Sequence, residues 1–219
     1  MASALTLAAF LAIWGFGQDS VNFDAVKPGT TPPNWTFLST RPQTGTRWEV
    51  RYDRTAPSRG NVLEKSESSI VEGDSPIAVF DKVVCRDGDL SVKFRIDGSG
   101  KSHTAGIVWR FVDQNNYYLL HFSADQKNIV LLRVLNGKRE AVPLTSDRRT
   151  LTWLSHDINV GQWYVAKVSF RGDKIRGFFG NRQLFEASDA GLTGPGKTGV
   201  WTRGRTTASF DDFRIDKKS

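Results

Sequence analysis

The side chains best suited to acid–base chemistry near neutral pH are three histidines, His103, His121 and His156. They are far apart in the sequence and share no ligand spacing, so a zinc site built from them is not expected. His121 lies in the apolar run YYLLHF, where it is either a strand histidine on the polar face of a sheet or a general base. Asp113 lies in the turn before this run. His121 and Asp113 are therefore the candidate catalytic residues.

Paired carboxylates would indicate glycosidic-bond hydrolysis. A retaining glycosidase needs two carboxylates about 5–5.5 Å apart, a separation that alternate residues of one strand provide. The chain has no Glu-x-Asp-x-Glu run. Asp87 and Asp89 share a parity, but they flank Gly88 in what we interpret as a turn. Hydrolysis by a conventional carboxylate pair is therefore not expected.

Saccharide recognition calls for aromatic faces and planar polar groups, and both occur in the central apolar runs. Arg110 lies in the middle of one run, where a charged side chain needs solvent or a ligand. Adjacent strand residues point to opposite faces, so we expect Arg110 to line a groove and Trp109 to lie in the core. The alternative for any of the aromatic side chains is the core. The candidate ligand-binding residues are Arg110, Asn116, Tyr117, Arg133, Trp201 and Arg203.

Oxygen ligands for a metal are found near both ends of the chain. Asp211 and Asp212 are adjacent in a predicted strand, so only one of them is expected to enter a given site. With Asp24, Asp212 could hold a structural calcium ion. The alternative is a hydrogen bond from loop backbone. Cys85 is the only cysteine, which excludes an intramolecular disulfide, and it is expected to be a buried strand residue.

The elements that must position these residues are predicted to be β-strands. Between Asp87 and Gly137, four runs rich in Val, Ile, Leu and aromatic residues are separated by turn-forming residues, the pattern of an antiparallel meander. Residues 90–96 and 164–170 alternate apolar and polar side chains, so each strand should have one buried and one solvated face. The central runs 107–112 and 117–122 are apolar on both parities. They should lie in the middle of a sheet, with aromatic side chains also on the face away from the core.

Further strands are expected on both sides of this region. The runs 47–53 and 61–66 are predicted strands, whereas 77–80 and 83–85 are two short runs broken by Asp81. A hairpin is expected around Gly180 and Asn181. Two final strands should be joined at residues 203–205. Helix should be scarce, with a single turn near Ala187–Gly191.

The N-terminal residues have the features of an export signal. Residues 5–16, LTLAAFLAIWGF, form an apolar run shorter than the ~20 residues that span a membrane as a helix. Gly15 and Gly17 are small residues at the positions that a signal peptidase requires before Gln18. We therefore predict a cleaved signal peptide at 1–17 and one domain at 18–219, secreted or periplasmic. The alternative is a buried N-terminal strand or helix.

The chain carries a net charge of +7, spread along its length without a run of five basic residues. No recognised nucleic-acid motif accompanies this charge, so nucleic acid is not an expected partner. Attraction to anionic polymers or to envelope surfaces is equally consistent with it.

Several segments of the sequence resemble the 3-keto-disaccharide hydrolase domain family, which is similar to glycoside hydrolase family 16 and to concanavalin A-like and laminin G jelly rolls. The segments that carry the resemblance cover most of the chain after residue 21: NFDAVKPGTTPPNW (22–35), WEVRYDRTAPSRGNVLEKS (48–66), DGDLSVKFRI (87–96), AGIVWRFVDQNNYYLLHF (105–122), NIVLLRVLNGKR (128–139), GQWYVAKVSFRGDKIRGFFGNRQLFEASD (161–189) and GKTGVWTRGRTTASFDDFRI (196–215).

The resemblance implies an all-β, concanavalin A-like jelly-roll β-sandwich of two antiparallel sheets with very little helix and a groove on its concave face. It also implies a domain, of bacterial type, that binds or processes a saccharide, with hydrolysis of 3-keto-glycosides as the family's named activity. The chain departs from the family at Tyr164, where His is frequent, and at residues 203–206, which are basic where an acidic residue is frequent. The alternative function is a non-catalytic, lectin-like or laminin-G-like binding module.

Overall fold

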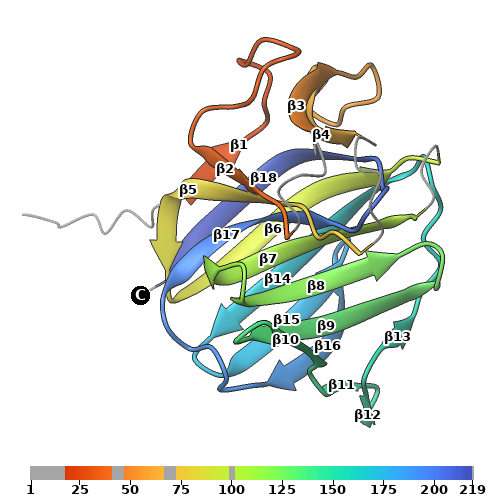
Figure 1. The fold of residues 1–219 in the computed structure, drawn as a ribbon. Helices are drawn as coiled ribbons and strands as arrows, with labels where there is room; N and C mark the ends of the chain where they lie inside the picture. The colour runs from red at the N-terminus through yellow and green to blue at the C-terminus, as the bar shows by residue number, and fades with distance from the viewer. Residues whose placement is uncertain (1–17, 41–46, 67–72, 99–101, 219) are drawn as a thin grey trace, which may run out of the picture.

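The computed structural model describes residues 18–40, 47–66, 73–98 and 102–218. Every regular element in these residues is a β-strand, and the strands form two sheets that pack face to face (Figure 1). The predicted signal peptide lies outside the described residues. The predicted all-β, jelly-roll sandwich is confirmed.

The first sheet, sheet A, has ten strands. Their order is β12 (Arg149–Leu151), β11 (Leu144–Ser146), β16 (Arg182–Ser188), β15 (Lys174–Phe179), β14 (Trp163–Arg171), β6 (Asp87–Ile96), β18 (Ala208–Lys218), β4 (Asn61–Ser66) and β3 (Arg47–Tyr52), with β1 (Gln18–Val21) beside β18.

The second sheet, sheet B, has eight strands and lies toward the viewer in Figure 1. Their order is β10 (Lys138–Ala141), β9 (Asn128–Leu135), β8 (Asn116–Ser123), β7 (Thr104–Asp113), β17 (Gly196–Thr202), β5 (Ile77–Cys85) and β2 (Trp35–Leu38), with β13 (Leu154–Ser155) beside β9. The strand pairs of both sheets are antiparallel.

The main core lies between the two sheets and follows from the alternation of the strands. In β6 each even-numbered residue from Leu90 to Ile96 is buried, and β14 repeats the pattern at Ala166, Val168 and Phe170. The ring of Phe94 in sheet A lies 4.9 Å from that of Phe122 in sheet B, centroid to centroid. Cys85 is buried in this core, as predicted.

Three local predictions are wrong. Asp87, Gly88 and Asp89, interpreted as a turn, are the first residues of β6 and pair with both neighbouring strands. Residues 77–85 form one continuous strand, because the Asp81 side chain accepts hydrogen bonds from Thr36 Oγ1 and Lys197 Nζ at the sheet surface and so does not break the strand. The helical turn predicted near Ala187–Gly191 is absent: β16 runs to Ser188, and the next amide, Asp189 N, donates to Asp173 O.

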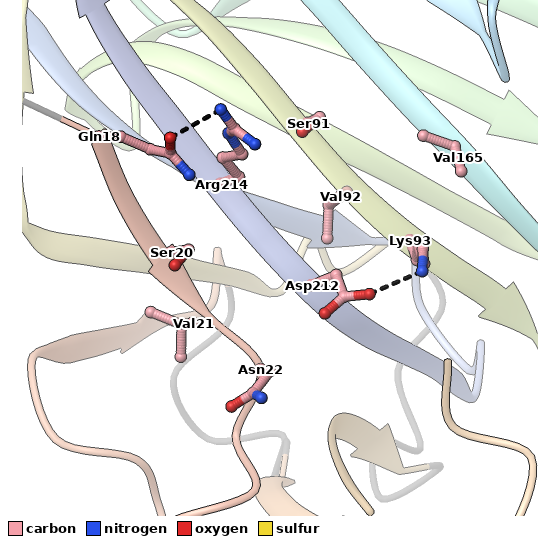
Figure 2. A pocket seen from close by; sticks show the side chains of 10 residues that line it. All are labelled: Gln18, Ser20, Val21, Asn22, Ser91, Val92, Lys93, Val165, Asp212 and Arg214. Atoms are coloured by element: carbon pink, nitrogen blue, oxygen red, sulfur yellow. Dashed lines mark hydrogen bonds and ion pairs between the residues drawn. The ribbon is translucent and has the colours of Figure 1, made fainter. Parts of the chain in front are cut away.

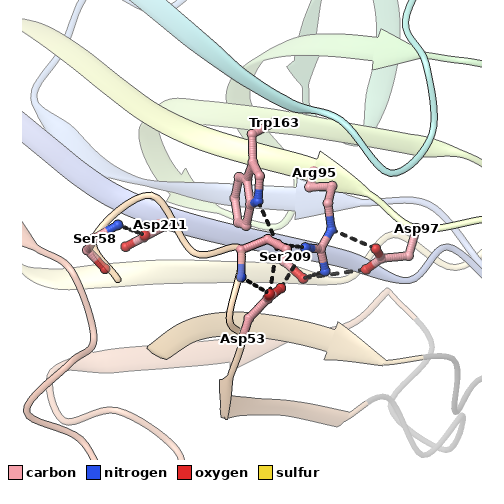
Figure 3. Close-up of polar contacts among 8 residues, drawn as sticks. Asp53, Ser58, Arg95, Asp97, Trp163, Ser209 and Asp211 are labelled. Carbon is pink, nitrogen blue, oxygen red and sulfur yellow. Dashed lines mark hydrogen bonds and ion pairs between the residues drawn. The ribbon is translucent and has the colours of Figure 1, made fainter. Parts of the chain in front are cut away.

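The segment between β3 and β4 is held against the outer face of sheet A by a polar network (Figure 3). Arg95 is its centre, with Nη1 2.6 Å from Asp53 Oδ2 and Nε 2.8 Å from Asp97 Oδ1. Thr55 Oγ1 accepts hydrogen bonds from Arg95 Nη1 and from Trp163 Nε1. The network holds the pKa of the Asp53 carboxyl below its usual value through hydrogen bonds with Thr55 and the charge of Arg95, which outweigh desolvation.

Candidate functional site

The outer face of sheet B carries a second apolar cluster, separate from the main core. It follows from the central runs that are apolar on both parities, since every second residue of these strands points away from the main core. This agrees with the prediction that aromatic side chains occupy both faces of the sheet. The cluster consists of Ile77, Val79, Val108, Phe111, Tyr117, Leu119, Val134 and Trp201.

Trp201 lies at the centre of this face because Gly106 leaves room for it. Gly106 is the cross-strand partner of both Trp201 and His121, and a Cβ atom at Gly106 would lie 3.2 Å from Trp201 Cε3. The His121 ring meets Trp201 edge to face, with centroids 5.4 Å apart and an angle of 88°. Trp201 is 1% exposed, so it lies beneath the polar side chains of the face.

Arg139 lies over the same indole from the neighbouring hairpin. Its Cζ atom is 5.6 Å from the centroid of the Trp201 ring, within the range of a cation–π contact. Nη2 donates to Ser75 Oγ at 3.2 Å. Burial raises the pKa of Tyr117, and the positive charge of Arg139 acts against this larger effect to lower it. Aromatic, hydroxyl and cationic groups from four elements therefore meet at one place.

His121 and Trp201 each have a buried polar atom without a hydrogen-bond partner among the described residues. His121 is 7% exposed, and within the described residues its Nε2 atom has no hydrogen-bond partner. Burial lowers the pKa of His121 to about 4, and the positive charges of Arg139 and Arg203 act in the same direction. The imidazole is therefore neutral at neutral pH, with one nitrogen able to accept a hydrogen bond.

Arg203 is positioned by a fixed connection between β17 and β18. The buried ammonium of Lys65 donates to Gly204 O at 2.6 Å and to Thr206 O at 2.9 Å, and Ser102 Oγ donates to Arg203 O. The Arg203 side chain is exposed at the rim of the face. In the described part of the chain neither Arg203 nor Arg139 forms an ion pair with a carboxylate.

Four of the residues selected from the sequence thus come together: His121, Tyr117, Trp201 and Arg203. Arg139 completes the group and was not selected. In the sequence it is only the second residue of the basic pair Lys138–Arg139 after the Asn136–Gly137 turn. Neighbouring basic residues do not show which way a side chain points.

Arg110 lies elsewhere, inside the sandwich. The pairing of β7 with β8 shifts register between Trp109 and Asp113, and Arg110 has a φ of 47° in this bulge. Its guanidinium donates to Arg86 O, to Leu192 O and to Asp87 Oδ1 and lies over the Phe170 ring. The expectation that parity directs Arg110 to the outer face is wrong because the bulge turns Arg110 inward beside Trp109. Trp109 lies in the main core, as predicted.

Arg133 lies at the edge between the sheets. It pairs with Asp189 at 2.8 Å and with Glu140 at 2.9 Å. The hydroxyl of Tyr118 donates to the same Asp189 carboxylate. Arg133 therefore joins β9 to the segment after β16.

Asp113 and Asn116 shape the turn between β7 and β8. Asp113 Oδ1 accepts from Asn115 N at 2.7 Å and from Asn116 Nδ2 at 2.9 Å, and Asn116 Oδ1 accepts from Asn136 N. His121 is five residues after Asn116 in β8, and it pairs with Gly106 of β7. The two candidate catalytic residues are thus at different places on sheet B.

Asp24 and Asp212 both have partners within the protein. The Asp24 carboxylate accepts hydrogen bonds from Asn61 N, Ser58 Oγ and Asn22 Nδ2. The alternative raised from the sequence, a hydrogen bond from loop backbone, is found at Asp211, which accepts from Ser58 N. Asp212 pairs with Lys93. Within the described residues, no group of three or more His, Cys, Asp or Glu side chains could hold a metal ion.

No model of a known protein family matches the chain, and no curated protein matches it. Solved structures do resemble it. The carbohydrate-binding module CBM66 from Bacillus subtilis is 16% identical, with a TM-score of 0.65 over 86% of this chain and 98% of that one. Domain 4 of AbnA, a GH43 extracellular arabinanase from Geobacillus stearothermophilus in complex with arabinotriose, is 14% identical, with a TM-score of 0.58 over 90% of each chain.

A third similar structure is the exoplasmic/lumenal domain of VIP36 in its Ca2+/Man-bound form, 13% identical, with a TM-score of 0.52 over 85% of this chain and 84% of that one. At these identities the likeness defines the fold, a jelly-roll sandwich shared with carbohydrate-binding modules and lectins. Among the described residues there is no apolar helix long enough to cross a membrane.

Proposed function

We propose that this protein binds a saccharide on the outer face of sheet B. The observation that carries the proposal is the convergence of His121 and Arg139 on Trp201, with the charge of Arg203 nearby and the Nε2 atom of a buried, neutral histidine without a partner among the described residues. A buried polar atom without a hydrogen bond is costly, so its presence favours a ligand group that completes it.

The chemistry of these groups fits hydroxyls. Neutral imidazole accepts a hydrogen bond from a hydroxyl, and each guanidinium donates several in a fixed plane. Trp201 and Tyr117, buried beneath, hold His121 and Arg139 in position. Proteins of the same fold are named as carbohydrate-binding, which supports the class of ligand.

The test is thermal unfolding of the full chain with a panel of neutral saccharides and 3-keto-glycosides. A ligand at 100 times its Kd stabilises the native state by about 2.7 kcal/mol, which should raise the midpoint by roughly 5–10 °C. Arg139→Gln should abolish the shift. Lys138→Gln, next to it on the same hairpin, should retain it. If no saccharide raises the midpoint, or if both variants respond like the wild type, the proposal is wrong.

A second candidate function is turnover of a 3-keto-glycoside, with export of the protein through residues 1–17. The sequence resemblance to keto-disaccharide hydrolases supports it, together with a histidine that is neutral and can accept a proton. His121→Phe should then abolish product formation. Asp113→Asn tests the second candidate residue separately. N-terminal sequencing of exported protein should find Gln18 first. Binding without any product would leave the lectin-like alternative.

A further inference from the structure

A cavity lies on the outer face of sheet A. The main core separates it from the sheet B site described above. The volume of the cavity is about 510 Å³, within the ~300–1,000 Å³ typical of small-molecule sites. The lining residues come from β1, the following residue Asn22, β6, β14 and β18 (Figure 2). Three strands that pair side by side, β1, β18 and β6, form most of its floor.

The cavity contains two pairs of polar groups, each with a donor beside an acceptor. Lys93 Nζ lies 2.7 Å from Asp212 Oδ2, and Arg214 Nη2 donates to Gln18 Oε1 at 2.7 Å. Figure 2 shows the two pairs apart from each other along the cavity. Lys93 and Asp212 are each 35% exposed, so both can still reach a ligand. The cavity is thus polar in two separate places.

The rest of the lining has smaller, uncharged side chains. Ser20 and Ser91 contribute hydroxyls, and Val21 and Val165 contribute apolar surface. Such a mixture suits a molecule that carries both hydroxyls and C–H faces. Aromatic stacking is not provided by the lining residues, so hydrogen bonds must supply the selectivity.

Asp212 reaches the cavity only because the backbone is strained there. The pairing of β18 with β6 shifts register between Asp211 and Arg214, and Asp212 has a φ of 47°. The shift places both Asp211 and Asp212 on the outer face, contrary to the expectation from simple alternation. Asp211 accepts hydrogen bonds from Ser58 N and Asp212 N, so it supports the fold, whereas Asp212 points to the cavity. Backbone strain at a non-glycine residue costs free energy and is often found at functional sites.

The charges of the cavity nearly cancel. Lys93 is neutralised by Asp212, and Arg214 is also paired with Asp216 at 3.2 Å. An ionic ligand would therefore gain little electrostatic binding free energy. A hydroxyl, in contrast, can donate to the Asp212 carboxylate and accept from the Lys93 ammonium. Adjacent ring hydroxyls of a sugar are spaced to meet a donor and an acceptor that lie side by side.

We propose that this cavity binds an uncharged saccharide, with adjacent hydroxyls of one sugar unit held between Lys93 and Asp212 and a second polar contact at Gln18 and Arg214. The site is independent of the one proposed on sheet B. A protein with saccharide sites on both sheets can bind two segments of a polysaccharide at once.

The test follows backbone amide resonances of the full chain while neutral disaccharides, maltose, cellobiose, lactose and sucrose, are added. Binding in the cavity should shift the amides of Ser20, Ser91 and Arg214. Asp212→Asn removes the charge but keeps a residue that tolerates a positive φ, so the bulge should persist. It should weaken binding roughly tenfold to a hundredfold, the loss of a charge-assisted hydrogen bond. Asp173→Asn, an exposed change in the turn between β14 and β15 and outside the lining, should bind like the wild type.

Three results would overturn the proposal. One is that no disaccharide shifts these three amides, and another is that Asp212→Asn binds as tightly as the wild type. The third is that galacturonate or inorganic phosphate shifts them while neutral sugars do not, which would indicate an anion site. Shifts confined to β8, β9 and β10 would support the sheet B site and contradict this one, so the two proposals can fail separately.

Discussion

His121 combines deep burial with a missing hydrogen bond, and these two properties have different consequences. Burial lowers its pKa to about 4 and so fixes the neutral form at neutral pH. Its Nε2 is a buried polar atom without a hydrogen-bond partner among the described residues, a cost that a ligand group could remove. The same residue should therefore influence both stability and binding.

The stability of the protein should fall between pH 6.5 and pH 4 because of His121. An unfolded chain binds a proton at this histidine below about pH 6.5, while the folded chain resists protonation until about pH 4. The stabilisation is thus present above pH 6.5 and declines as the pH falls, by about 3 kcal/mol near pH 4. Urea unfolding at pH 7.5 and pH 5 should show a smaller loss for His121→Phe than for the wild type. Equal losses would contradict the assignment.

Arg110 illustrates a charged residue that stabilises the fold from inside. It is 1% exposed and its donors satisfy Arg86 O, Leu192 O and Asp87. Arg110→Met leaves these acceptors unpaired and should lower the free energy of unfolding by roughly 2–4 kcal/mol. The control is Arg176→Met, which removes an exposed pair with Glu186 and should cost no more than about 0.5 kcal/mol. Similar losses in urea unfolding of both variants would refute this role.

At the scale of the element, β7 and β18 share a structural feature, a β-bulge. Each contains a bulge with a non-glycine residue at positive φ, Arg110 in β7 and Asp212 in β18. In β7 the neighbouring strand permits the bulge through Gly196, where a Cβ atom would collide with the Arg110 backbone. Each bulge shifts the alternation by one residue, which directs Arg110 inward and Asp212 outward.

The segment between β3 and β4 should depend on Arg95 for its position. Replacing Arg95 with Met removes the ion pairs to Asp53 and Asp97 and the donor to Thr55, so the segment should open locally. Hydrogen exchange at the Ser58 amide, which donates to Asp211, should accelerate at least about tenfold. Lys174→Met, an exposed change on the same sheet, is the control. Unchanged exchange in Arg95→Met would show that the segment is held by other contacts.

At the scale of the whole molecule, the two sheets are joined by packing and by polar contacts at their edges. The main core spans both sheets, and Arg133 and Tyr118 of sheet B meet Asp189 at the open edge. The described residues offer no cluster of metal ligands to reinforce this arrangement.

Calcium should therefore have little effect on the stability of the protein. Asp24 is occupied by three hydrogen bonds and Asp212 by Lys93, so neither offers a free set of oxygen ligands. Thermal unfolding in millimolar CaCl2 and in EDTA should give the same midpoint. A higher midpoint with CaCl2 that is lost in Asp24→Asn would restore the calcium hypothesis.

The sequence by itself determined the strands and their assembly into a sandwich. Alternation with a period of two is a local property, and it specifies which face of β6 and β14 is buried. The runs 107–112 and 117–122, apolar on both parities, likewise predicted aromatic side chains on the outer face of sheet B, where Phe111 and Tyr117 lie. His121 could be selected from its residue type and its place in the run 117–122, and Arg203 from its residue type in the basic connection at 203–205.

Only the tertiary structure decided where individual polar side chains point. Arg110 and Asp212 face opposite to their sequence parity because a bulge depends on the neighbouring strand, which local sequence does not report. Arg139 joins Trp201 and Ser75 through contacts between residues distant in sequence. The cavity on sheet A has the same origin, because β1 and β18, at opposite ends of the chain, must pair to form it.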